Sequence, residues 1–201
     1  SVDFGEGCRA TKIALGGKHT CALIQCVGDD VLDMKCWGSN IYGQLGQGSA
    51  MSEYGGYQDY IYDLPPISLG VDFHPVEIFA DEDSSCALSQ NDELKCWGKN
   101  YSSEIGNSTS FEIGDQSFEM GGNLDPLDFG GHGVLDISFS CSSATNCRAC
   151  ALLAEGQMQC WSNKPSIGPY LGLGVSTAQP FVPGGNSTVD LGRYFRPLEQ
   201  E

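Results

Sequence analysis

The stretch Thr20–Gly48 reads TCALIQCVGDDVLDMKCWGSNIYGQLGQG. Two of its cysteines, Cys21 and Cys36, each adjoin a short hydrophobic run with the composition of a strand, and Trp37 and a glycine-rich turn follow the second run. Seen once, such a pair is compatible with a reactive thiol, a metal site or a structural disulfide. If the pattern recurs along the chain, a structural disulfide is favoured over a reactive thiol or a metal site.

The pattern recurs with a nearly constant spacing. The tripeptide Cys-Ala-Leu occurs at Cys21, Cys86 and Cys150, at offsets of 65 and 64 residues. A Cys-Trp dipeptide follows each copy, and its tryptophans are Trp37, Trp97 and Trp161. Related tetrapeptides open successive copies: VDFG at Val2, ISLG at Ile67, LDFG at Leu127 and VDLG at Val189. These landmarks divide the chain into repeat 1 (1–66), repeat 2 (67–126), repeat 3 (127–188) and the start of a fourth repeat (189–201).

The runs inside each repeat predict β-strands. In DELKCWG and GQMQCWS apolar and polar residues alternate, which is the period of a half-buried strand. Polar turns rich in Gly, Asn and Asp separate successive runs, as in hairpins. Short strands at regular spacing, with one Gly/Trp motif per repeat, predict an all-β fold in which each repeat forms one blade of a β-propeller. We expect the three tryptophans to lie in the core.

Two segments of repeat 1 resemble the repeats of the regulator of chromosome condensation family: GGKHTCAL (Gly16–Leu23) and CWGSNIYGQLGQG (Cys36–Gly48). Repeats 2 and 3 depart from this pattern, since DEDSSCAL and TNCRACAL lack the Gly and His. The resemblance covers essentially the whole chain and implies blades of four antiparallel strands. Family rings contain more blades than three repeats supply, so we expect a partial propeller or a fragment of a longer array. A cysteine on each of two neighbouring strands resembles the secreted or cell-surface version of the family.

Ten cysteines, an even number, indicate disulfides and an oxidising compartment. The repeat pattern predicts three bonds between neighbouring strands: Cys21–Cys36, Cys86–Cys96 and Cys150–Cys160. The other four cysteines are paired by elimination as Cys141–Cys147 and Cys8–Cys26, with an intermolecular bond as the alternative.

Three N-glycosylation sequons agree with passage through the secretory pathway. They lie at Asn100, Asn107 and Asn186, which are the candidate N-glycan positions, and Asn107 and Asn186 are favoured because they lie in polar loops. Asn100 also occupies the turn after a Cys-Trp-Gly motif, so its side chain has an alternative role in that turn.

A tyrosine-rich segment, EYGGYQDYIYDL, connects repeats 1 and 2. It contains Tyr54, Tyr57, Tyr60 and Tyr62. Tyrosine offers rigid contact area with a polar tip, so these residues are candidates for binding a protein or glycan partner. The alternative is that they pack the segment onto its own blade.

The formal net charge of −16 excludes nucleic acid as a favoured partner, because so acidic a surface repels phosphates. The acidic turns DEDSS (81–85) and GDD (28–30) are weak candidates for Ca²⁺, and solvated turns are the favoured interpretation. His19 is expected to form a hydrogen bond in blade packing. No motif identifies a catalytic or metal-binding residue, and no apolar run is long enough for a membrane span.

These observations together predict an extracellular, non-enzymatic propeller module for protein interaction, adhesion or assembly scaffolding. Its partner would be a protein, a glycan, or further copies or blades of the same assembly, with N-glycans and no other cofactor. One alternative is a lectin-like or inhibitor-like recognition propeller that uses the tyrosine-rich segment. A less favoured alternative is guanine-nucleotide exchange, the role that names the family, because disulfides and sequons argue against its compartments.

Overall fold

A computed structural model of the protein describes residues 2–49, 53–54, 61–100, 105–107, 111–141, 147–162, 183 and 188–189. The chain divides into two compact units. The first unit comprises Ser1–Tyr101 and Thr109–Leu127, and the second comprises Ser102–Ser108 and Asp128–Glu201. Each unit is described by itself below.

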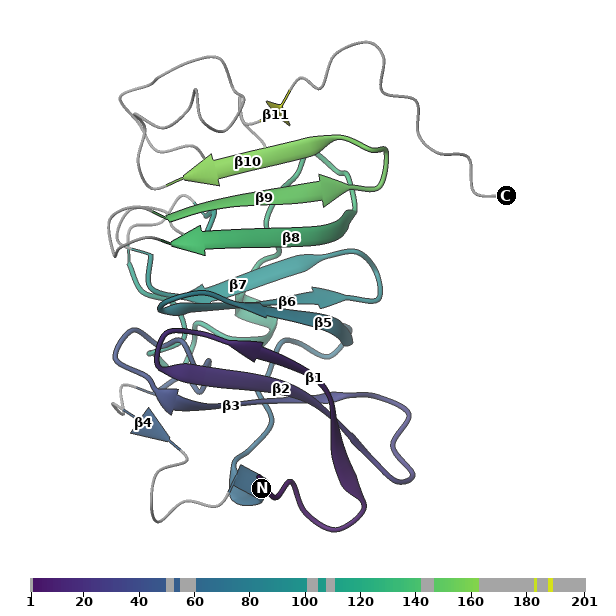
Figure 1. Ribbon diagram of the computed structural model, residues 1–201, viewed down its shortest axis with the longest axis vertical. Helices are drawn as coiled ribbons and strands as arrows, with labels where there is room; N and C mark the ends of the chain where they lie inside the picture. The colour runs from purple at the N-terminus through teal and green to yellow at the C-terminus, as the bar shows by residue number, and fades with distance from the viewer. Residues whose placement is uncertain are drawn as a thin grey trace. The chain divides into compact units, whose positions relative to one another are not determined.

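The first unit contains two antiparallel sheets. Its first sheet has the order β1-β2-β3-β4 (Figure 1). The strands are β1 (Cys8–Leu15), β2 (His19–Cys26), β3 (Asp33–Ser39) and β4 (Glu53–Tyr54). The register between β2 and β3 places Cys21 opposite Cys36 and Thr20 opposite Trp37.

The second sheet of this unit repeats the same plan. It consists of β5 (Pro75–Ala80), β6 (Ser84–Ser89) and β7 (Leu94–Gly98), in that order. Cys86 lies opposite Cys96, as Cys21 lies opposite Cys36. An isolated bridge joins Gly98 to Ile113, in the place where β3 pairs with β4 in the first sheet. The register also shifts in the equivalent part of the first hairpin of both sheets.

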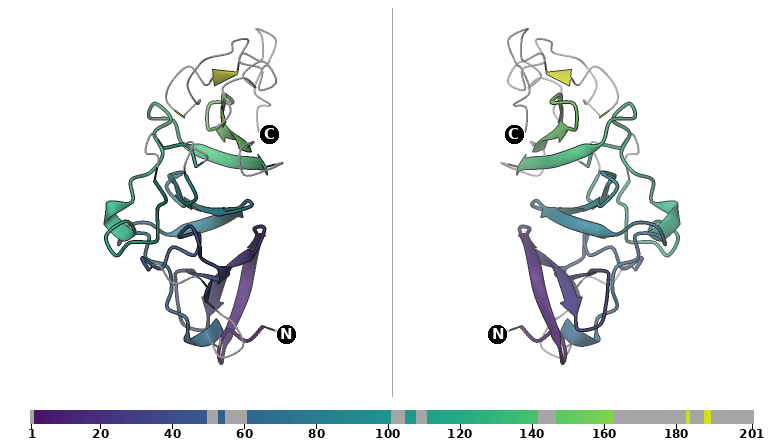
Figure 2. Two further views of the ribbon diagram at one scale, coloured as in Figure 1. Left: turned by 90° about the vertical axis from the view of Figure 1, so that its left-hand side faces the viewer. Right: turned by 90° about the vertical axis from the view of Figure 1, so that its right-hand side faces the viewer.

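The second unit contains one four-stranded antiparallel sheet with the order β11-β10-β9-β8. Its strands are β8 (Val134–Cys141), β9 (Cys147–Leu153), β10 (Met158–Ser162) and β11 (Thr188–Val189). Cys150 lies opposite Cys160, so the register of the cysteine pair is the same in all three sheets. The predicted all-β propeller fold is therefore confirmed, with one sheet for each repeat (Figures 1 and 2).

Three of the tetrapeptides that open repeats in the sequence form backbone pairs with the sheet of the preceding repeat. Ile67 N donates to Met34 O at 2.8 Å, and Leu127 N donates to Leu94 O at 2.8 Å. Val189 lies in register opposite Met158 in the same way. ISLG and LDFG therefore pair with the third strand of the preceding sheet, and Val189 of VDLG does the same. Val189, assigned from sequence to a fourth repeat, thus forms part of the third sheet.

The core of the first unit lies between its two sheets and is organised around Trp97. This side chain is fully buried, and its indole Nε1 donates to Gln44 O at 3.1 Å. A Cβ added to Gly46 would lie 2.8 Å from that same nitrogen, and one added to Gly114 would lie 3.3 Å from the ring. Both glycines also have positive φ angles, +65° and +101°, so the glycine-rich turn of repeat 1 at Gly46 and the backbone of repeat 2 at Gly114 together have the shape that covers this tryptophan.

The three tryptophans are not equivalent. Trp161 is fully buried, as Trp97 is, and its ring centroid lies 5.9 Å from that of Phe129 and 6.2 Å from that of Phe139. Trp37 is only half-buried and contacts Phe4, with ring centroids 6.0 Å apart. The prediction that all three lie in the core is wrong for Trp37. Trp97 is covered by the turn of the repeat before it.

Two single-turn 3-10 helices, η1 (Ile61–Asp63) and η2 (Gly121–Asn123), interrupt the connections. Within the described residues, no helix has the length and hydrophobicity needed to cross a bilayer.

Candidate functional sites: repeat disulfides and an acidic-rimmed cleft

Each repeat contains one disulfide between its two central strands. The bonds Cys21–Cys36, Cys86–Cys96 and Cys150–Cys160 have Cα–Cα distances of 4.1, 4.1 and 4.0 Å. They join the same pairs that the repeat pattern predicts, and we call them the repeat disulfides. Since these bonds recur with the hairpin and sit largely in its interior, they are structural cross-links of the blade.

The other cysteines are also oxidised where the structure describes them. Cys8 and Cys26 face each other at the open end of the first hairpin and form a disulfide, with a Cα–Cα distance of 4.0 Å. Cys147 is disulfide-bonded, and Cys141 lies opposite it in the β8–β9 register. The side chain of Cys141 lies outside the described residues, so its predicted bond to Cys147 stays a prediction.

The chain contains one spacing that is typical of redox and metal sites, Cys147-Arg-Ala-Cys150. The structure does not join these two cysteines, because Cys150 is bonded to Cys160. Among the described residues, no group of three or more His, Cys, Asp or Glu side chains is placed to hold a metal ion.

A buried polar network joins repeats 1 and 2. His19 Nε2 lies 2.9 Å from Ser85 Oγ, and that hydroxyl donates to Gln44 O at 2.8 Å. Because the hydroxyl hydrogen is committed to Gln44, His19 Nε2 is the donor in the first contact and its Nδ1 carries no proton. Burial lowers the pKa of His19 to about 4, which keeps the ring neutral. His19 is therefore the packing hydrogen bonder that the sequence predicts.

The acidic turn DEDSS has its carboxylates engaged in local structure. Asp81 Oδ1 accepts from the backbone N–H of Asp83 at 3.2 Å and of Ser84 at 3.0 Å. Burial nevertheless raises the pKa of Asp81 to about 6. Asp83 Oδ2 lies 3.6 Å from Lys99 Nζ. These contacts support the interpretation of the segment as a structural turn.

The asparagines of the three sequons differ in what the structure shows of their exposure. Asn100 has 0% of its surface exposed, which supports the alternative role of its side chain in the turn, because a bulky glycan has no room on a buried amide. Its burial follows from its position in the turn after β7. Asn107 is half-buried, and Asn186 lies outside the described residues, so glycosylation at these two positions stays a prediction.

The tyrosine-rich segment is described only in part. Tyr62 lies in η1 with 41% of its surface exposed, and its carbonyl accepts from Lys35 Nζ at 2.8 Å. Tyr54 belongs to β4 and pairs through its backbone with Gly38. Tyr57 and Tyr60 lie outside the described residues. The predicted binding role of the four tyrosines is therefore still a prediction.

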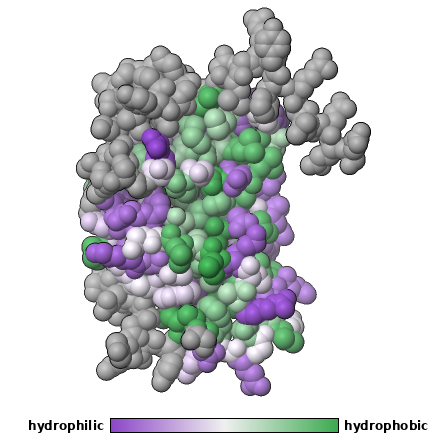
Figure 3. All heavy atoms as spheres, viewed as in Figure 1, coloured by the Kyte–Doolittle hydropathy of each residue, from purple (hydrophilic) through white to green (hydrophobic). Residues whose placement is uncertain are grey.

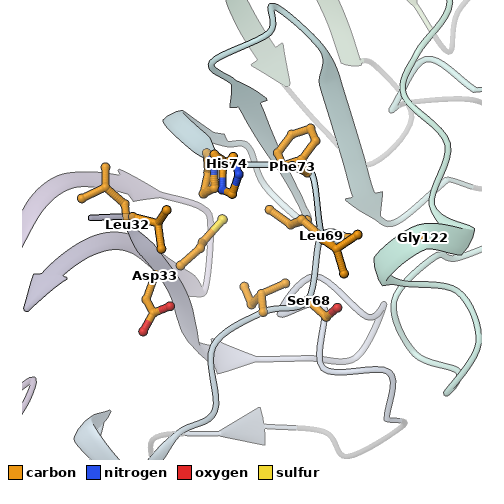
Figure 4. Close-up of a pocket in the computed structure, with 13 residues that line it drawn as sticks. Leu32, Asp33, Ser68, Leu69, Phe73, His74 and Gly122 are labelled. Carbon is orange, nitrogen blue, oxygen red and sulfur yellow. The ribbon is translucent and has the colours of Figure 1, made fainter. Parts of the chain in front are cut away.

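A cleft that sequence reasoning missed opens in the first unit. It has a volume of about 430 Å³ and lies between the end of the β2–β3 turn and the segment from Ile67 to Pro75 (Figure 4). Buried apolar side chains form its floor: Met34, Ile67, Leu69 and Phe73. Leu32 and His74 line it from different segments, and Gly122 of η2 closes one side. Several of these residues lie far apart in sequence, so no local motif marks the cleft.

The chain is thus a repeat protein of the β-propeller class, with a disulfide inside each blade. Solved structures resemble it in fold. No protein-family model and no curated protein matches the sequence.

Three solved structures illustrate the similarity. Human WBSCR16 is 18% identical with a TM-score of 0.59, and the match covers 87% of this chain and 38% of that one. Yeast RCC1 (Prp20) bound to Kap60 is 19% identical with a TM-score of 0.56, over 94% and 37% of the two chains. Prp20p from Saccharomyces cerevisiae, in a second structure, is 18% identical with a TM-score of 0.53, over 90% and 37%. At such identities the likeness shows the fold alone, and this chain spans less than two fifths of each protein's length.

Proposed function

We propose that the chain is an extracellular, non-enzymatic propeller module for protein interaction, adhesion or assembly scaffolding. The observation that carries the proposal is the presence of a disulfide in the same register of all three blades. Such bonds form and persist in oxidising compartments and are rare in the cytosol. The remaining described cysteines are disulfide-bonded as well, so none of them offers a free thiol that would favour a cytosolic role.

A role in protein interaction agrees with the fold and with its solved neighbours. Yeast RCC1 is bound to Kap60 in one neighbour structure, and Prp20p is described with binding to Gsp1p and histones in another. Propellers present many loops at the two ends of their blades, and loops are the usual place of binding residues.

The proposal is tested on the native protein by mass spectrometry under non-reducing conditions. We expect the three repeat disulfides intact, no free thiol, and a glycan at Asn107 or Asn186 but not at Asn100. Free thiols at Cys21 and Cys36, together with unmodified asparagines, would contradict an extracellular role. A nucleotide-exchange assay with small GTPases is expected to show no acceleration, and clear acceleration would refute the non-enzymatic part.

A further inference from the structure

The cleft of the first unit combines two features that ordinary surface loops do not share. Its floor is apolar and buried, and both bordering segments carry aspartate: Asp29, Asp30 and Asp33 in one and Asp72 in the other. Figure 3 shows, in addition, that hydrophobic side chains interrupt the polar surface of the strands; Ile13 and Leu15 of β1 are each 67% exposed. Ile13 and Leu15 are exposed on a strand, whereas the residues of the cleft enclose a cavity.

We propose that this cleft binds an extended peptide segment of another protein, with an aliphatic side chain in the cleft and a lysine or arginine beside it. The inference rests on the proposed role in protein interaction and names the chemistry of the partner. It follows from the apolar lining, the exposed valines at the mouth and the charge of the rim.

The apolar part of the site is available to a ligand. Val71 lines the cleft with 91% of its surface exposed, and Val31 lines it with 49% exposed. Covering such side chains removes apolar surface from water, which favours association. A volume of about 430 Å³ lies within the range of about 300–1,000 Å³ typical of ligand pockets. One aliphatic side chain and part of its backbone fit such a space.

The rim gives the sign of the charge that the ligand carries. Asp29 and Asp30 precede Val31 in the β2–β3 turn, Asp33 lines the cleft, and Asp72 lies between Val71 and Phe73. Three of these aspartates are exposed and Asp33 is half-buried. In Figure 4 the Asp33 carboxylate points away from the centre of the cleft, so it would meet a neighbouring ligand residue rather than the inserted one.

The ammonium group of Lys95 lies behind the cleft wall and already has hydrogen-bond partners in the protein. Lys95 Nζ donates to Leu69 O at 2.8 Å and to Gly121 O at 3.2 Å, and it lies 5.2 Å from the centroid of the Phe73 ring. The Lys95 side chain is buried and holds the cleft wall together. The rim that faces solvent therefore stays acidic, which favours a basic ligand and disfavours acidic or phosphorylated ones.

Binding is measured with the oxidised 201-residue chain and three fluorescein-labelled pentapeptides: Gly-Lys-Leu-Lys-Gly, Gly-Lys-Ser-Lys-Gly and Gly-Glu-Leu-Glu-Gly. Fluorescence anisotropy at about 0.15 M salt keeps long-range attraction small, because the Debye length is then about 8 Å. We expect the Lys-Leu-Lys peptide to bind at least tenfold more tightly than either other peptide, a difference of about 1.4 kcal/mol. Backbone amide NMR shifts are expected at Val71 and Asp72.

Two variants locate the site and two matched variants control for it. Val71→Ser changes an exposed lining residue of the cleft and Asp72→Asn changes the exposed residue next to it, and each is expected to weaken binding of the Lys-Leu-Lys peptide severalfold without changing the unfolding midpoint. Phe118→Ser removes an apolar side chain that is 82% exposed elsewhere in the unit. Glu82→Gln removes a carboxylate in the β5–β6 turn, at the other end of the strands. Neither control is expected to alter binding.

Each alternative result overturns the proposal. Equal binding of the Lys-Ser-Lys peptide would mean that only net charge attracts the ligand, and equal binding of the Glu-Leu-Glu peptide would mean that the aspartates do not select it. Absence of binding, or binding unaffected by V71S and D72N, would exclude the cleft. These failures leave the proposed extracellular role intact, since that role is decided by the disulfides and glycans of native material. Free thiols there would refute the role without altering the peptide result.

Discussion

Replacing Trp97 by alanine tests whether repeats are joined chiefly through the turn that covers this side chain. Trp97 is fully buried and lies against Gly46 and Gly114, and it donates a hydrogen bond to Gln44 O. Substituting a buried tryptophan by alanine costs about 3–5 kcal/mol, since apolar contacts are lost and a cavity remains. Trp37 provides the matched control because it has the same place in repeat 1 and is only half-buried. Its replacement should cost about half as much, roughly 1.5–2.5 kcal/mol.

Urea denaturation followed by far-UV circular dichroism measures both variants, with the disulfides intact in each. We expect the first transition of W97A to move to a clearly lower urea concentration than that of W37A, with similar slopes. Trp97→Phe keeps an aromatic ring but removes the five-membered ring of the indole with its N–H donor, and Gln44 O still accepts from Ser85 Oγ at 2.8 Å. Its cost should therefore be smaller, about 1–2 kcal/mol. If W97A were no more destabilising than W37A, the inference that the turn of repeat 1 secures repeat 2 through Trp97 would be wrong.

Three further predictions follow from the same unit. Replacing Cys21 and Cys36 together by serine opens a loop with a sequence separation of 15 and should lower stability by about 3 kcal/mol, which urea midpoints under oxidising conditions would show. An added Cβ at Gly16 would lie 2.1 Å from the His19 ring and 2.5 Å from Asp81 O, so Gly16→Ala should cost about 1–3 kcal/mol, whereas Gly122→Ala, which meets no atom within 4 Å, should be nearly neutral. His19 and Asp81 should give pH dependences of opposite sign. The pKa of His19 is lowered to about 4, so the unfolded chain binds its proton more readily and stability falls as the pH drops from 6.5 to 4. The pKa of Asp81 is raised to about 6, so the folded chain binds its proton more readily and stability falls as the pH rises from 3.8 to 6. Asp81→Asn should therefore leave a profile that rises with pH in this window, and His19→Gln one that falls; identical profiles for the two variants would contradict both assignments.

The parts of the structure that depend on local pattern could be predicted from sequence. Cys-Ala-Leu and Cys-Trp recur at a fixed distance, so the two central strands and their cross-link were recognisable in every repeat. The alternation in DELKCWG likewise identified β7. Sequence also predicted a packing hydrogen bond for His19, because His19 lies in the Gly-x-x-His-Thr element of repeat 1 and repeats 2 and 3 lack a histidine there.

The features that sequence missed arise from contacts between distant segments. Trp37 and Trp97 have the same local motif, and the turn of repeat 1 that covers Trp97 lies outside that motif. Asn100 reads as a sequon, yet it is fully buried in the turn after β7. The cleft is assembled from the β2–β3 turn, the segment after Ile67 and η2, so its residues share no spacing.

Because the opening tetrapeptides pair with the preceding sheet, a structural unit that can be exchanged by cloning or recombination has other boundaries than the sequence repeat. A cut between residues 66 and 67, at the sequence boundary, would remove Ile67 N from Met34 O and leave β3 without that partner. A transferable segment therefore begins at a first strand and continues through the following tetrapeptide, as from Cys8 to Gly70. Adjacent segments defined in this way do not overlap, since the next first strand, β5, begins at Pro75, so an exchange of one repeat requires a donor that supplies both the blade and the tetrapeptide that follows it.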